Sequence, residues 1–117
     1  MRGLIKRVND ARRGHPALHT NERLMFHPVD NPNLLAYTKN LPARRDLVLG
    51  VVNFDYRAAQ SGVIELDLDA LGLPTDSPFE AIDLLDDRTY VWGGRHSSVE
   101  LDPAVRAAYL FWLRPIR

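Results

Sequence analysis

The chain of 117 residues fits a single domain, because one hydrophobic core usually serves about 100–150 residues. Its 15 Lys and Arg residues balance 15 Asp and Glu residues, which argues against nucleic acid or an anionic membrane as a partner. The absence of cysteine excludes disulfides, thiolate metal sites and cysteine nucleophiles. No apolar stretch is long enough to cross a bilayer and no signal peptide is evident, so we expect a cytoplasmic protein.

The first segment predicts a helix over Arg2–Arg13. Leu4, Ile5 and Val8 follow helical spacing and form one apolar stripe. Gly14 then supplies a stop signal. A helix this short is marginal in isolation. We therefore expect self-association, or packing on the rest of the chain, through this stripe.

After Pro16 the hydrophobic period changes to two, which is typical of strands. The segments on either side of residues 85–88 predict a hairpin, and we expect the next predicted strand to pair with one of its arms. The strands predicted in chain order are Arg23–His27, Leu34–Lys39, Leu47–Phe54, Gly62–Leu68, Phe79–Leu84, Thr89–Trp92, Ser97–Leu101 and Tyr109–Leu113, with a helical turn at Leu68–Leu71.

About eight short strands with regular turn signals predict an all-β, antiparallel β-sandwich preceded by one N-terminal α-helix. We expect residues 1–19 to hold the helix and residues 20–117 the sandwich. Charge is segregated: Arg2–Arg23 carries six basic and two acidic residues, and Gly62–Asp102 carries two basic and ten acidic residues. One explanation is that these charges lie on solvent-exposed faces of the helix and the sheet. The other is that the basic helix docks on an acidic surface, within the chain or on a partner.

The histidines do not form a metal-binding motif. His15 and His19 have the spacing of two ligands on one helix face, but Pro16 between them argues against a helix there. His27 lies at a strand end and His96 in a glycine-rich turn. We expect no metal site and no cofactor.

A group of acidic residues raises the possibility of hydrolytic chemistry. Asp83, Asp86 and Asp87 are close in sequence, and a glycosidase needs two acids about 5–10 Å apart. A tight turn explains these residues more simply, because Asp accepts local backbone hydrogen bonds. A small independent hydrolase is therefore the weaker hypothesis, and we predict no catalytic residue.

Aromatic residues suggest a binding surface. An exposed indole can stack on a sugar ring, and Trp92 with Tyr90, beside Gly93, is the candidate pair. The competing interpretation is a tryptophan packed in the core. The last predicted strand, Tyr109–Leu113, is apolar on both faces, so we expect it to be central in the sandwich or docked against a neighbour.

Several of these stretches together resemble the C-terminal end of one enzyme family. The similarity is to the alpha-1,4-glucan:maltose-1-phosphate maltosyltransferases of the alpha-amylase superfamily (glycoside hydrolase family 13), with related tails in trehalose synthases. The segments that carry the resemblance are Val8–Leu18, Leu24–Asn31, Leu34–Lys39, Leu49–Asp55, Gln60–Leu66, Val91–Arg95 and Val99–Pro103.

The resemblance implies that Arg2–Arg13 is the last helix of a catalytic (β/α)₈ barrel and that the rest is the all-β domain after it. The catalytic motifs of the superfamily lie upstream, so no catalytic residue carries over. Asp86-Asp87 departs from a Thr-Gly-like turn of the family. We expect a non-catalytic structural or interface domain with a barrel as partner. The alternative is a stand-alone module that binds alpha-glucan.

Overall fold

The computed structural model describes residues 23–41, 46–55, 57–104 and 108–116, and all structural statements below concern these residues. The predicted helix Arg2–Arg13, the boundary between residues 19 and 20, and His15 and His19 lie outside this range.

Strands dominate the described part of the chain. Along the sequence they are β1 (Met25–His27), β2 (Leu34–Leu41), β3 (Asp46–Asn53), β4 (Gln60–Glu65), β5 (Phe79–Asp83), β6 (Arg88–Trp92), β7 (His96–Leu101) and β8 (Ala108–Pro115), with the short helix α2 (Leu68–Leu71) between β4 and β5.

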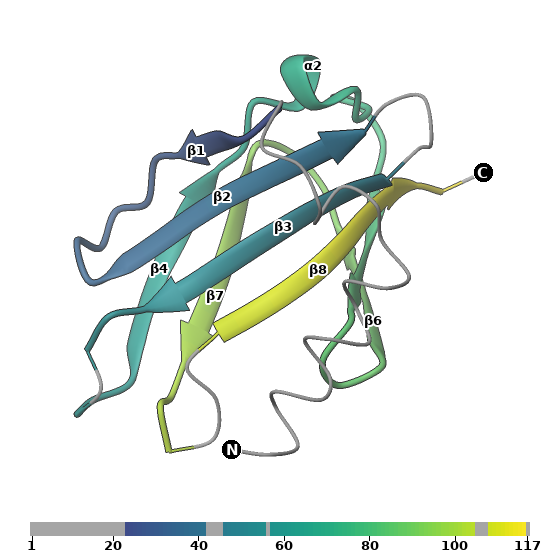
Figure 1. Ribbon diagram of the computed structural model, residues 1–117. Coiled ribbons are helices and arrows are strands. Elements are labelled where there is room, and N and C mark those ends of the chain that lie inside the picture. Colours follow the sequence, from purple (N-terminus) through teal and green to yellow (C-terminus); the bar gives the residue numbers. More distant parts are fainter. Residues whose placement is uncertain (1–22, 42–45, 56, 105–107, 117) are drawn as a thin grey trace.

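The strands form two antiparallel sheets. The larger sheet has six strands in the order β1-β2-β3-β8-β5-β6, and the smaller sheet consists of β4 and β7. In Figure 1, β4 and β7 run behind β2 and β3 as a second layer. We call the face of the larger sheet toward β4 and β7 the inner face, and the opposite side the outer face. The predicted all-β, antiparallel two-layer fold is confirmed.

One predicted pairing is wrong. We expected Ser97–Leu101 to pair with an arm of the β5–β6 hairpin, but β7 pairs with β4, with Gln60 opposite Leu101 and Glu65 opposite His96. Alternation identifies a strand but carries no information about its partner. Val99 and Leu101 are buried in the core against the larger sheet, and this burial accounts for the crossover to the second layer.

The main core lies between the two sheets. Leu47, Leu49 and Val51 of β3 and Phe111 and Leu113 of β8 point into it, as the period of two requires. Val48 and Leu110 are next to these residues in sequence and point the other way, into a separate cluster with Leu85 on the outer face. Because β8 lies between β3 and β5, its central position explains its two apolar faces, which is one of the two explanations that the sequence left open.

Helix α2 forms where the sequence predicted a helical turn. The Asp67 side chain accepts a hydrogen bond from the amide of Ala70, at 3.2 Å, and so caps the first turn. Gly72 ends the helix in the left-handed region at φ 74°, which glycine adopts without a steric penalty. Leu68 and Leu71 point into the main core.

A buried asparagine joins the two layers. Asn53, at the end of β3, donates from Nδ2 to the carbonyl of Leu101 at 3.0 Å and to that of Ala58 at 3.1 Å. Its Oδ1 accepts from the amide of Asp55 at 2.8 Å. These bonds satisfy buried polar groups and hold β3 against β7. In the described ranges, no helix is long and apolar enough to cross a membrane.

Candidate functional site

The aromatic pair predicted from the sequence lies on the inner side of β6. Tyr90 and Trp92 alternate along the strand and therefore share a face. The ring of Trp92 meets Phe111 at a centroid distance of 4.9 Å and Phe79 at 6.4 Å, both edge to face. Tyr90 also contacts Phe111 edge to face, at 6.2 Å. Phe111 thus brings the two candidate residues into one aromatic cluster.

The two members of this pair differ in their exposure. Trp92 packs against the main core, so much of its ring serves stability. Tyr90 keeps 38% of its surface exposed at the edge strand of the larger sheet. The arrangement offers a partly exposed tyrosine beside a core tryptophan. The alternation in the sequence predicts that Tyr90 and Trp92 share one face of the strand. The packing in the structure shows that Tyr90 is the more accessible of the two rings.

The predicted acidic group forms a turn. Asp83 is 1% exposed, and its Oδ1 accepts a hydrogen bond from the amide of Leu85 at 2.9 Å. The amide of Asp87 donates to the Asp83 carbonyl at 2.9 Å, and Asp87 itself has φ 54°. Asp86 forms an ion pair with Arg88, at 3.2 Å. These contacts support the turn interpretation of the sequence and build the connection between β5 and β6.

The two described histidines lie in different environments. Nε2 of His27 lies 2.8 Å from Oγ1 of Thr38 across the β1–β2 pair, in a buried hydrogen bond. Burial lowers the pKa of His27, and the nearby Asp67 carboxylate partly opposes this effect. His96 is exposed at the start of β7. Within the described residues, no group of three or more His, Cys, Asp or Glu side chains could hold a metal ion.

A cavity of about 880 Å³ lies where β8 ends beside α2. Its wall includes Leu47, Gly72, Glu80, Trp112 and Arg114. Nε of Arg114 donates to Oε1 of Glu80 at 2.9 Å, and its guanidinium lies 5.0 Å from the centre of the Trp112 ring. The Glu80 carboxylate is therefore held in an ion pair. The sequence analysis did not predict the Glu80–Arg114 ion pair, because the two residues are 34 positions apart and no local pattern connects them.

A comparison with protein families identifies the chain. The family model described as "GLGE, C-terminal" matches residues 26–113. The chain belongs to this family. The match begins in β1 and ends within β8, so it covers the strands of both sheets.

Curated relatives of this GLGE C-terminal domain are much longer proteins. It is 43% identical over 109 residues to the alpha-1,4-glucan:maltose-1-phosphate maltosyltransferase of Methylacidiphilum infernorum, covering 93% of the chain and 16% of that protein. It is 41% identical over 111 residues to maltosyltransferase 2 of Streptomyces coelicolor, covering 95% of the chain and again 16% of the relative. The chain thus spans about a sixth of the length of these relatives.

Solved structures share the fold at low sequence identity. An Anoxybacillus alpha-amylase matches 97% of the chain and 22% of its own, with a TM-score of 0.65 and 14% identity. The maltogenic alpha-amylase AmyB of Thermotoga neapolitana matches 85% of the chain and 23% of its own, with a TM-score of 0.58 and 12% identity. At this identity the likeness concerns the fold.

Proposed function

We propose that this GLGE C-terminal domain is a non-catalytic structural and interface domain of a maltosyltransferase-like protein that acts on alpha-glucan. The proposal rests on the alignment with the relatives, which covers nearly all of this chain but only a small part of each relative. The domain aligns over 93% of its own length but over only 16% of the Methylacidiphilum relative. The use of Asp83, Asp86 and Asp87 in turn contacts supports the same view. The expected partner is a catalytic (β/α)₈ barrel.

The first experiment asks whether the domain has activity of its own. The purified chain is incubated with maltose 1-phosphate and glycogen, and released phosphate is measured. We expect no release above that of a buffer control. Turnover that the variant Asp86→Asn abolishes would contradict the proposal, because it would place the reaction in the β5–β6 turn.

The second experiment asks whether the domain supports a barrel. In the Methylacidiphilum infernorum maltosyltransferase, the 109 aligned residues are deleted, or are replaced by this chain. We expect the deletion to lower the unfolding midpoint and the maltosyl transfer rate, and the replacement to restore both. A chimera as unstable as the deletion would contradict the interface role.

A second candidate function is binding of alpha-glucan at the aromatic cluster. The partial exposure of Tyr90 next to Trp92 favours it. In a titration with maltoheptaose, this function predicts a change in tryptophan fluorescence that Tyr90→Ala removes. Val91→Ala is the matched control, because Val91 is 65% exposed on the opposite side of the same strand. The absence of a spectral change at millimolar sugar would eliminate this candidate.

The proposed place of action is the cytoplasm. Support comes from the sugar phosphate in the names of the relatives, since such charged substrates do not cross membranes freely. Cell fractionation with an antibody against the chain tests this location. Recovery in the culture medium or the membrane fraction would contradict it.

A further inference from the structure

A buried asparagine lies in the wall of the cavity beside α2. Asn40, on the inner face of β2 opposite Leu47, is 8% exposed and lines the cavity of about 880 Å³. In the part of the chain that the structure describes, its carboxamide makes no hydrogen bond. Buried amides are normally paired, because an unpaired one has lost its bonds to water. The Asn40 carboxamide therefore has both a donor and an acceptor available to a ligand.

The other buried asparagine shows what a structural role looks like. Asn53 is 6% exposed, and its carboxamide takes part in three hydrogen bonds of 2.8–3.1 Å with main-chain groups. Asn40 lies at the opposite end of the β2–β3 pair and has no such main-chain partner among the described residues. The comparison indicates that the Asn40 amide does not serve the connection of the strands.

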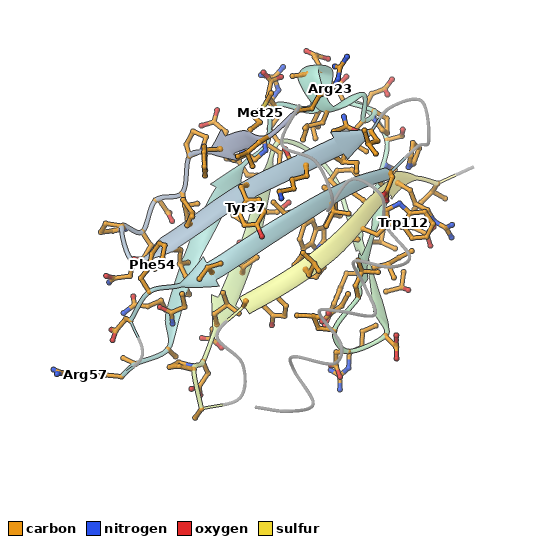
Figure 2. The ribbon with its side chains drawn as sticks, in the orientation of Figure 1. Arg23, Met25, Tyr37, Phe54, Arg57 and Trp112 are labelled. Carbon is orange, nitrogen blue, oxygen red and sulfur yellow. The ribbon has the colours of Figure 1, made fainter. Side chains whose placement is uncertain are left out.

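The wall around Asn40 is largely apolar. Leu47 of β3, Leu113 of β8, and Leu71 and Leu73 at the end of α2 line the cavity, and all four belong to the main core. In Figure 1, α2 lies at the end of the sandwich where β2 ends and β3 begins, and Figure 2 shows Trp112 near the C-terminal end of β8. An aliphatic group placed between α2 and the sheet is thus removed from water.

The charged groups that line the cavity are already paired. Glu80 accepts a hydrogen bond from Arg114 at 2.9 Å, and Asp69 forms an ion pair with Arg95 at 3.6 Å. Of the described residues in the cavity wall, no others carry a charge. A charged ligand would have to compete with these ion pairs, so the site favours a neutral one.

We propose that this cavity binds an apolar peptide segment of a partner protein. A leucine-sized side chain of the segment lies between α2 and the sheet, and an adjacent peptide group hydrogen-bonds to the Asn40 carboxamide. A peptide group is neutral and carries one donor and one acceptor, which matches the free amide. The inference does not depend on the proposed function.

The size and the surroundings of the cavity suit this occupant. Its volume of about 880 Å³ lies within the range of about 300–1,000 Å³ that is typical of ligand sites, so it admits a side chain with its flanking peptide groups. Pro115 lines the cavity, and the following Ile116 is 44% exposed, which extends the apolar surface for neighbouring residues of the segment. A sugar suits the site less well, because its hydroxyl groups would face leucine side chains.

The decisive experiment is an NMR titration of the isotope-labelled chain with N-acetyl-leucine methylamide, a neutral mimic of one peptide unit. We expect the side-chain NH₂ resonances of Asn40 and the methyl resonances of Leu71 and Leu113 to shift and to saturate at millimolar probe. The absence of a shift at Asn40 would overturn the proposal.

Further probes define the class of ligand. N-acetyl-glycine methylamide lacks the side chain and should bind about tenfold more weakly. A capped pentapeptide with leucine between alanines should bind more tightly than the single unit, because it also contacts the rim. Equal affinities of the pentapeptide and the single unit would contradict a polypeptide segment. Tighter binding of the N-acetyl-leucine anion, or of maltose, would show a site for anions or for sugars and would refute the proposal.

A matched pair of variants tests the role of the amide. Asn40→Leu should weaken the probe about tenfold, monitored at the methyl groups of Leu113, and should leave the unfolding midpoint unchanged or higher, since the fold loses no hydrogen bond. Lys39→Leu, on the opposite face of the same strand, should bind the probe like the wild type. A clear loss of stability in Asn40→Leu would show that the amide serves the fold and would contradict the proposal.

A second variant tests the cavity without changing Asn40. Ala70 is an exposed residue of α2 in the cavity wall, so Ala70→Phe should narrow the cavity and weaken the probe. Wild-type affinity in this variant would place the probe outside the cavity and refute the proposal.

Discussion

The two faces of the larger sheet are built by the same strands but are buried in different ways. On the inner face, β3 and β8 pack against the smaller sheet and α2 around a large core. On the outer face, the buried cluster among the described residues consists of Val48, Leu85 and Leu110, flanked by partly buried Leu41 and Leu84. Strand alternation therefore distributes apolar side chains to both faces, whereas the depth of burial depends on what covers each face.

We expect the largest loss of stability from truncating a buried leucine, and we expect this loss to differ between the two faces of the larger sheet. Leu49 is 0% exposed on the inner face, and Leu110 is 8% exposed on the outer face, one strand away. We expect Leu49→Ala to cost about 3–5 kcal/mol and Leu110→Ala about 2 kcal/mol, because the better covered site leaves the larger cavity. Urea denaturation measures both. A larger cost for Leu110→Ala would make the outer cluster the principal core.

The next effect concerns the crowding of the outer face. A methyl group added at Gly50 would overlap the ring of Tyr37 at Cζ. The ring would therefore have to move, and we expect Gly50→Ala to cost about 1–3 kcal/mol in thermal or chemical unfolding.

Two controls sharpen this prediction. At Gly93 the nearest atom to an added Cβ would be 3.9 Å away, so Gly93→Ala should change stability little. In a Tyr37→Ala background the cost of Gly50→Ala should fall, because the obstructing ring is gone. An unchanged cost in that background would show that the penalty has another source.

A smaller effect is expected at the turn that carries Leu85 to the outer cluster. Asp87 has φ 54°, a conformation in which Asp and Asn are tolerated and β-branched residues are strained. We expect Asp87→Val to lower the free energy of unfolding by about 1–2 kcal/mol. Asp87→Asn is the control, since it removes the charge but keeps the preference for this conformation. If both variants lose the same stability, the charge of Asp87 matters and its backbone conformation does not.

The smallest effect is a pH dependence on the inner side. Burial depresses the pKa of His27 in the folded protein below the ordinary value of 6.5. The neutral form is thus favoured by folding, and stability should fall as the pH drops below about 6.5 toward the depressed pKa. His27→Asn should reduce this slope relative to the wild type. Identical pH profiles of the two proteins would exclude His27 as the cause.

Much of the fold could be predicted from local patterns. The alternation in residues 34–39 and the valine-rich run in residues 47–54 predicted β2 and β3, and both are strands. The helical turn at Leu68–Leu71 and the β5–β6 hairpin were also predicted, because caps and turns depend on a few adjacent residues. The partner of β7 was predicted wrongly, since strand pairing depends on contacts between residues far apart in the chain, such as Gln60 with Leu101.

Only part of the candidate site could be predicted from the sequence. A period of two places Tyr90 and Trp92 on one face, which the strand β6 confirms. That Phe111 contacts the Trp92 ring could not be inferred, because β8 follows β6 only after a crossover to the other sheet. The Glu80–Arg114 ion pair was missed for the same reason.

Local sequence accounts for where strands, turns and caps form, because these depend on side-chain alternation and on backbone preferences of neighbouring residues. Three properties depend on the three-dimensional packing: the pairing of the strands, the accessibility of each aromatic ring and the face of the larger sheet that forms the main core. These properties arise from contacts between segments far apart in the chain, and their energies depend on the surface that is actually removed from water.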